Sequence, residues 1–299
     1  MKKRYLIFAF IPTVIWGLGY VVQTVGVKAI GPNTLNATRF LLAFVFMYPF
    51  VRIRRKKIYA ENDVERVVRK SALIRGSIIC GVFLFIANFF QMWGFKYTSP
   101  GKASFITSLY IIIIPFLGLY FGQKMSKKVL FCVAIALFGM YLLCLTDGIS
   151  NVNKGDILEL IGAFGFSFQI IAISYYSPKC DSLSLATFHI LVAGILSTFA
   201  MFVMENPTWI AIEGAWFPIV YSALLISAIG YTFQIISQKH LTPTVASLIF
   251  SMESVFALFF AWILLHETLS AKEMFGCVLL FVAIIISQLP EKSAINTAP

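Results

Sequence analysis

Charged residues are scarce in this chain. Asp, Glu, Lys and Arg make up 12% of its 299 residues, whereas soluble domains carry about 25%. A soluble protein needs more polar side chains to cover its surface, and intrinsic disorder needs low hydrophobicity with high charge. Both classes are excluded, and the 59% of hydrophobic residues predict an integral membrane protein.

Residues typical of catalytic and metal sites are also few. The chain has three histidines and five cysteines, no C-x-x-C pair and no phosphate-binding Walker sequence. The four aspartates, Asp63, Asp147, Asp156 and Asp181, are expected in loops or at span ends. A membrane-embedded enzyme would need paired aspartates, a nucleophile with a histidine, or a metal cluster at membrane depth. We therefore expect that the protein is not an enzyme and that it binds neither a metal nor a cofactor. A membrane-embedded enzyme is the alternative class of function.

Long hydrophobic runs, in contrast, fill most of the chain. A helix that crosses about 30 Å of hydrocarbon needs about 20 apolar residues. Ten such runs lie near 5–25, 33–51, 72–95, 103–122, 127–145, 155–176, 182–203, 214–237, 243–264 and 272–289. The runs are continuous rather than alternating, which favours helices over the strands of a membrane barrel. The sequence predicts an all-α polytopic membrane protein with ten transmembrane helices.

The basic residues behind the net charge of +11 are distributed along the chain as the expected topology requires. The charge therefore does not indicate nucleic-acid binding. With Met1 inside, 18 of the 24 Lys and Arg residues lie on the inner side and five on the outer side. This bias predicts a multi-pass membrane protein with both termini in the cytoplasm. The basic segment 52–75 contributes most; it is interpreted as a topology determinant or as a contact with anionic lipid.

An internal repeat divides the chain. The segments 90–104 (FQMWGFKYTSPGKAS) and 233–247 (FQIISQKHLTPTVAS) share six of 15 residues at an offset of 143. We therefore predict two halves, 1–146 and 147–299, with five spans each. Because five is odd, the second half enters the membrane from the opposite side, which gives inverted-topology repeats and suits transport by alternating access.

The order of several short motifs resembles the drug/metabolite transporter superfamily, in its ten-helix EamA-type branch. These motifs are Trp16-Gly17, Arg39-Phe40, Pro100, Gly155-Asp156 and the stretch from Ser251 through Glu267. Two positions depart from the family pattern: Glu253-Ser254, where Glu-Pro is common, and Gln123, where the family has glutamate and the second half keeps Glu267. The resemblance implies a bacterial plasma-membrane protein that exports amino acids or other small metabolites.

Four ionisable residues are expected inside the spans, where a charge costs about 3 kcal/mol or more. One of them, Glu159, lies only about one turn inside the sixth span. Glu253 lies at the centre of the ninth span and is interpreted as a cavity carboxylate that binds a substrate amine or carries a coupling proton; the alternative is a structural glutamate. Arg39 would hold a substrate carboxylate, or pair with a neighbouring helix. His189 is the repeat counterpart of Arg39 and would be a ligand or a packing residue.

Uncharged polar and aromatic residues complete the predicted site. Gln91 and Gln234 are a repeat-related pair, and Asn88 and Tyr231 hold equivalent places three residues earlier. These groups line a cavity or join helices by hydrogen bonds. Trp16, Tyr20 and Gln23 share one face of the first span, and Tyr110, Trp93 and Phe256 are expected to join them. Pro115 is a predicted hinge.

The sequence thus predicts a secondary transporter that exports small metabolites such as amino acids across the plasma membrane by alternating access. Its expected partners are a small-molecule substrate, the lipid bilayer and a coupling proton. Transport of other small solutes, such as drugs, sugars or nucleoside-like compounds, is the alternative within this class.

Overall fold

The computed structural model describes residues 3–58, 63–120, 127–144, 153–266 and 270–288. The predicted boundary between residues 146 and 147 lies outside these ranges, as do Gln123 and Glu267. Within them the regular elements are all helices. In the first half these are α1 (Lys3–Ile30), α2 (Pro32–Ile58), α3 (Asp63–Gly94), α4 (Pro100–Thr107), α5 (Tyr110–Tyr120) and α6 (Lys127–Cys144).

The second half has a similar series with more interruptions. Its elements are α7 (Lys154–Tyr176), the 3-10 turn η2 (Ser177–Lys179), α8 (Ser182–Met204), α9 (Trp209–Gly214), α10 (Trp216–Tyr221), the π-helical segment η3 (Ser222–Gly230), α11 (Tyr231–Gln238), α12 (Pro243–Phe250), α13 (Met252–Leu265) and α14 (Ala271–Gln288).

By length and composition, eight helical segments of the described residues can cross a membrane. They are Arg4–Ile30, Pro32–Arg54, Val67–Gly94, Pro100–Leu119, Lys154–Lys179, Ser182–Met204, Trp216–Gln238 and Pro243–Leu265. The two remaining predicted runs correspond to α6 and α14, which carry shorter apolar stretches. The chain is therefore a polytopic helical membrane protein.

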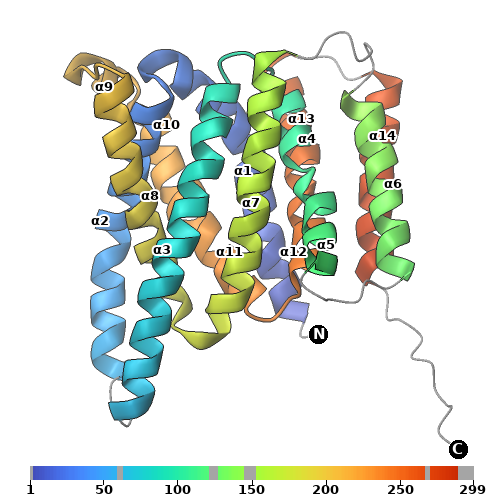
Figure 1. The fold of residues 1–299 in the computed structure, drawn as a ribbon. Coiled ribbons are helices and arrows are strands. Elements are labelled where there is room, and N and C mark those ends of the chain that lie inside the picture. The colour runs from blue at the N-terminus through green and yellow to red at the C-terminus, as the bar shows by residue number, and fades with distance from the viewer. Residues whose placement is uncertain (1–2, 59–62, 121–126, 145–152, 267–269, 289–299) are drawn as a thin grey trace, which may run out of the picture.

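The long helices form one bundle, with α6 and α14 packed together at one side and α2, α3 and α8 at the other (Figure 1). Between them lie α1, α7, α11 and α13. Small residues permit the closest approaches. A Cβ on Gly17 of α1 would lie 2.3 Å from Phe256 Cβ on α13, and one on Gly165 of α7 would lie 2.8 Å from the Ala87 backbone on α3. Glycine at these positions lets neighbouring helices touch along their backbones.

Two spans are broken at corresponding places. One break separates α4 from α5 at Ser108, and the other separates α12 from α13 at Ser251; these positions are 143 residues apart, the offset of the sequence repeat. Pro115 lies inside α5, after the first break, and the hinge predicted there stays a prediction. Serine hydroxyls bridge the breaks: Ser254 Oγ contacts Ser108 Oγ and donates to Ser104 O over 2.9 Å.

A third span contains the π-helical segment η3 between α10 and α11. A π-helix widens the turn and often marks a functional site. Here the Trp16 indole of α1 donates to Ile226 O of η3 over 3.3 Å. Gly230, at the end of η3, leaves room for that ring, since a Cβ there would lie 2.5 Å from Trp16 Nε1.

Candidate functional site

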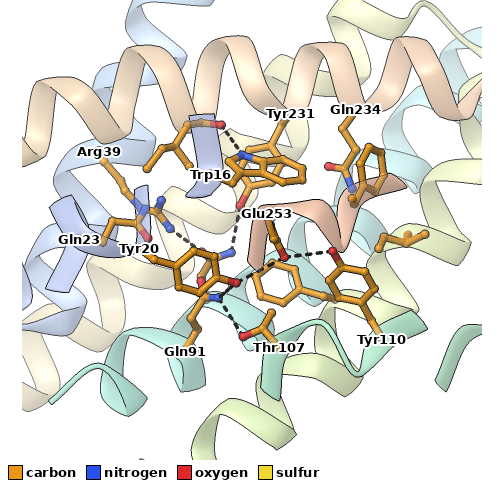
Figure 2. Close-up of a pocket in the computed structure, with 15 residues that line it drawn as sticks. Trp16, Tyr20, Gln23, Arg39, Gln91, Thr107, Tyr110, Tyr231, Gln234 and Glu253 are labelled. Atoms are coloured by element: carbon orange, nitrogen blue, oxygen red, sulfur yellow. Dashed lines mark hydrogen bonds between the residues drawn. The ribbon is translucent and has the colours of Figure 1, made fainter. Parts of the chain in front are cut away.

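A small cavity lies near the middle of the bundle, with a volume of about 40 Å³. Side chains from both halves of the chain line it (Figure 2). The lining residues are Trp16, Tyr20, Gln23, Arg39, Asn88, Gln91, Thr107, Tyr110, Phe166, Ile170, Ile226, Tyr231, Gln234, Phe250 and Glu253. Nine of the ten predicted site residues are therefore brought together, and His189 is not among them.

Glu253 occupies the first turn of α13, directly after the break at Ser251. Its side chain is buried, and its Oε1 accepts hydrogen bonds from Tyr110 over 3.0 Å and, more weakly, from Tyr20 over 3.4 Å. The N-terminal end of a helix favours negative charge because backbone N–H dipoles point toward it. The break thus creates a local environment that a carboxylate can occupy at membrane depth.

Arg39 projects from α2 into the cavity wall, to one side of Glu253 (Figure 2). It is fully buried, and its guanidinium donates to Asn36 Oδ1 over 3.0 Å and to Asn88 Oδ1. In the described part of the chain no carboxylate lies within ion-pair distance of it. Two amides are weak compensation for a buried charge, which is normally paired. A ligand carboxylate would complete its environment.

Gln91 joins Glu253 to a second carboxylate that sequence reasoning had placed near a helix end. Its Nε2 donates to Tyr20 Oη over 3.2 Å and to Thr107 Oγ1 over 3.3 Å. Thr107 in turn donates to Glu159 Oε2 over 2.8 Å. Glu159 is fully buried, so Glu253 is not the only carboxylate inside the bundle. The sequence signal was available, because Glu159 lies in an apolar run one turn from its end.

The repeat-related glutamines have different partners. Gln234 of α11 exchanges two side-chain hydrogen bonds with Gln169 of α7, over 3.2 and 3.5 Å. This pairing leaves Gln234 fewer groups for a ligand than Gln91 has. It also shows that an amide in the cavity wall can serve to join helices, as the sequence left open.

Two other contacts join residues at the repeat offset. Asn88 Nδ2 donates to Tyr231 Oη over 3.3 Å, and Tyr110 Oη donates to Glu253 Oε1 over 3.0 Å. In both pairs the residues are 143 positions apart. Equivalent positions of the two halves therefore meet at the cavity.

Three residues lie away from the place expected for them. His189 lies on α8 behind Tyr231, with ring centroids 5.6 Å apart, and its Nδ1 contacts Leu185 O. Trp93 lines a separate surface pocket beside Tyr97, because it is two residues from Gln91 and faces the other side of α3. Phe256 packs on Phe10.

The cavity wall offers several kinds of polar group to a small molecule. It presents a buried cation, a buried carboxylate, neutral amides and aromatic rings. Among the described residues no group of three His, Cys, Asp or Glu side chains is placed to hold a metal ion. The donors and acceptors match a ligand that carries both charges.

Comparisons with known proteins agree with this description. The model of the EamA-like transporter family matches residues 3–145 and again residues 153–289. An uncharacterized transporter of Archaeoglobus fulgidus is 30% identical over 281 residues, with 92% of this chain and 82% of the relative covered. A probable amino-acid metabolite efflux pump of Salmonella typhimurium is 25% identical over 300 residues, with 96% and 95% covered.

The fold is also known from experiment. A crystal structure resembles this chain with a TM-score of 0.72 at 16% sequence identity, and the match covers 95% of this chain and 97% of the other. These relatives carry the names of transporters and efflux pumps rather than of enzymes. Because the family model matches nearly the whole chain in two copies, the protein belongs to the EamA-like transporter family.

Proposed function

We propose that the protein exports zwitterionic amino-acid metabolites across the plasma membrane. The observation that carries this proposal is the presence, in one cavity wall, of Arg39 without a carboxylate partner and of Glu253 without a cationic one. A substrate carboxylate on Arg39 and a substrate ammonium on Glu253 would complete both sites. Two of the relatives are named probable amino-acid metabolite efflux pumps, which supports this choice of substrate.

Transport proceeds by alternating access between two inverted five-span halves, residues 1–146 and 147–299, with ten spans in all. The helix breaks at Ser108 and Ser251, which obey the repeat offset, support this arrangement. So do the broken helices themselves, since secondary transporters commonly bind substrates beside discontinuous helices. Both termini are cytoplasmic, as the basic residues near the end of α2 and the start of α3 favour.

The described conformation is closed around the cavity. A volume of about 40 Å³ holds about three water molecules. Sites for small organic molecules occupy about 300–1,000 Å³. Substrate therefore enters only after helices on one side of the cavity separate. The coupling ion is a proton, which binds Glu253 when the substrate ammonium has left.

The proposal is tested by competition in proteoliposomes. Purified protein is assayed for counterflow of a labelled amino acid against an excess of the zwitterion, of the matching amino alcohol, or of the matching carboxylic acid without an amine. We expect the zwitterion alone to compete strongly. In Arg39→Gln the zwitterion should lose its advantage over the amino alcohol, because only the carboxylate contact is removed.

The matched control is Arg54→Gln. Arg54 is an exposed arginine that pairs with Asp181 at the surface over 3.4 Å, so this change should leave the competition pattern unaltered. Strong competition by sugars or nucleosides instead of zwitterions would overturn the substrate class while keeping the transporter.

A further inference from the structure

Glu159 has an unusual environment for a residue without an assigned role. It lies on α7 and is fully buried, and its Oε2 accepts one hydrogen bond, from Thr107. Its Oε1 is buried as well and has no hydrogen-bond partner among the residues that the structure describes. An ionised carboxylate with one unpaired buried oxygen is costly, whereas a protonated one carries its hydrogen on that oxygen.

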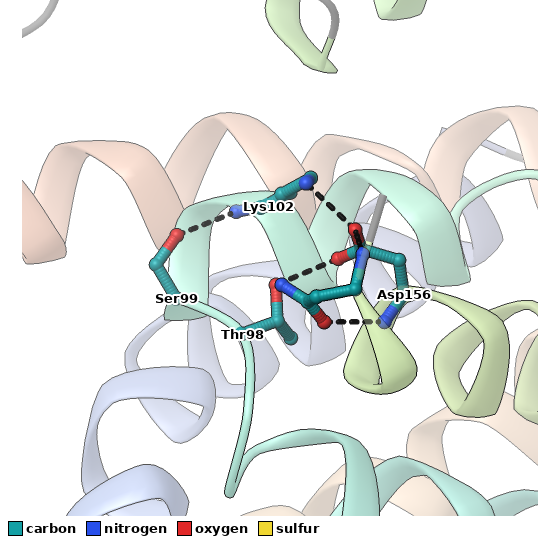
Figure 3. A network of polar contacts seen from close by, with 5 residues as sticks. Thr98, Ser99, Lys102 and Asp156 are labelled. Atoms are coloured by element: carbon teal, nitrogen blue, oxygen red, sulfur yellow. Dashed lines mark hydrogen bonds and ion pairs between the residues drawn. The ribbon is translucent and has the colours of Figure 1, made fainter. Parts of the chain in front are cut away.

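The surroundings of Glu159 are shaped to hold a carboxyl group against the backbone of α3. A Cβ added to Gly94 would lie 2.5 Å from Glu159 Oε1, so only glycine leaves room there. Asp156 lies one turn nearer to the start of α7, where it accepts from Thr98 and pairs with Lys102 over 2.7 Å (Figure 3). This network ties α4 to α7 and covers Glu159 on that side.

Glu159 and Glu253 are the two ends of one hydrogen-bonded chain. From Gln91 one arm runs through Tyr20 to Glu253, and the other begins at Thr107 (Figure 2). The second arm continues from Thr107 to Glu159. Gln91 donates both amide hydrogens, so it orients the two hydroxyls toward the carboxylates and is not itself a proton carrier. Both carboxyl groups therefore respond to the same set of hydrogen bonds.

We propose that Glu159 is a second proton-binding site, whose occupancy is coupled to that of Glu253. Two carboxylates in one buried network resist simultaneous ionisation, because like charges repel in a medium of low polarity. When no substrate ammonium is bound, an ionised Glu253 favours a protonated Glu159, which takes up a proton from hydronium and becomes a carboxylic acid, leaving water. When a substrate ammonium binds and balances Glu253, Glu159 releases that proton to water, so one proton is exchanged for one substrate.

The other titratable groups that face this pair are few. Tyr20 and Tyr110 contact Glu253, Asp156 with its partner Lys102 lies beside Glu159, and Arg39 and Tyr231 face the cavity. Among them, Asp156 pairs with Lys102 and accepts from Asn153 N, whereas Glu159 has no cation within ion-pair distance among the described residues.

The inference rests on the proposed function, since it gives Glu159 a part in the same transport cycle. Its first test does not need a substrate. Infrared difference spectra of the purified wild type, recorded during a pH titration in lipid, should show the C=O stretch of two buried carboxylic acids. Glu159→Gln should remove one band and displace the titration of the other to lower pH, because the neighbouring negative charge is gone.

A second test follows the pH profile of counterflow, with each variant normalised to its own maximum. For Glu159→Gln we expect the midpoint to move by about one pH unit toward lower pH, the order of effect of a nearby like charge. Thr107→Val, which removes the donor to Glu159 and keeps it protonated, should move the midpoint in the same direction. Thr13→Val is the matched control, because Thr13 is equally buried but bonds only Phe10 O of its own helix.

The outcomes separate the two proposals. An unaltered infrared spectrum in Glu159→Gln, or an unaltered midpoint in both variants, would overturn the second proton site. If zwitterions are not exchanged by the wild type, the proposed substrate is wrong, yet the infrared titration still decides on Glu159. Should Glu159→Gln fail to fold, Thr107→Val and the wild-type spectrum give the answer.

Discussion

At the scale of single residues, Glu253 is the group on which the proposed transport depends most. Its carboxylate has hydroxyl donors from Tyr20 and Tyr110, and no cation within ion-pair distance in the part of the chain that the structure describes. Two neutral donors stabilise an ionised carboxylate only in part. A substrate ammonium or a proton is needed to balance it, which links substrate binding to pH.

Glu253→Gln keeps the shape and the acceptor oxygen for Tyr110, but it removes the charge and the titration. We expect the affinity for a zwitterion to fall by about tenfold or more at every pH, because a hydrogen bond to a charged group contributes about 1.5–3 kcal/mol. Residual transport should respond more weakly to a pH gradient, because Glu253 no longer binds a proton. Transport kinetics at several pH values measure both effects, and an unchanged affinity and pH response would make Glu253 structural.

The residues of the site were largely predictable, but their partnerships were not. Polar side chains inside apolar runs can be recognised as site candidates from the sequence, because hydrocarbon excludes them unless they have a function or a partner. Which carboxylate Gln91 reaches depends on how α1, α4 and α7 pack around α3, and no local pattern encodes that. The same reason explains why Trp93 and His189 were expected in the cavity wall and lie outside it.

At the scale of elements, the apolar runs predicted the helices well because the thickness of hydrocarbon fixes their length. The breaks at Ser108 and Ser251 carry no glycine or proline of their own, so the sequence did not reveal them. They are stabilised by tertiary contacts instead, chiefly by Ser254, which bonds across to Ser104 O and contacts Ser108. Ser254, at the position where the family often has proline, thus has a structural role in this chain.

The start of α2 is capped by a side chain from another helix end. Glu205, just after α8, accepts hydrogen bonds from Asn33 N and Thr34 N over 2.8 Å each and from Thr34 Oγ1 over 2.6 Å. Gly31 precedes them with φ of 90°, and a Cβ there would lie 2.8 Å from the Glu205 carboxylate. Free N–H groups at a helix start need such acceptors.

Glu205→Ala leaves these donors without an acceptor, so we expect a loss of about 1–3 kcal/mol in the free energy of unfolding. Thermal unfolding in detergent, followed by circular dichroism, measures the change. Glu213→Ala, an exposed glutamate of α9, serves as the control and should leave the transition where it is. Equal transitions in both variants would contradict the role of this cap.

At the scale of the whole molecule, the orientation in the membrane determines which helix ends face the cytoplasm and which face the outside. The distribution of Lys and Arg predicts that the start of α3 lies in the cytoplasm and the start of α7 outside. In a variant without the five native cysteines, Lys154→Cys should react with an impermeant thiol reagent added to intact cells. Lys70→Cys should react only after the cells are opened. The side chains of Lys154 and Lys70 are both exposed, so burial does not protect either position from the reagent. The reverse pattern would refute the orientation.

The contacts between repeat-equivalent positions have a consequence for how such a chain arose. If one half-length gene supplied two identical subunits in the proposed arrangement, Tyr110 and Glu253 would be the same residue facing its own copy. Two glutamates there would repel, and two tyrosines would leave the substrate ammonium without an anion. Fusion of the duplicated genes lets the two copies mutate separately, so that one position becomes the donor and the other the acceptor. Asn88 and Tyr231 have diverged in the same way. In the proposed arrangement, the residues next to the symmetry axis are thus those that gain most from separate mutation of the two copies.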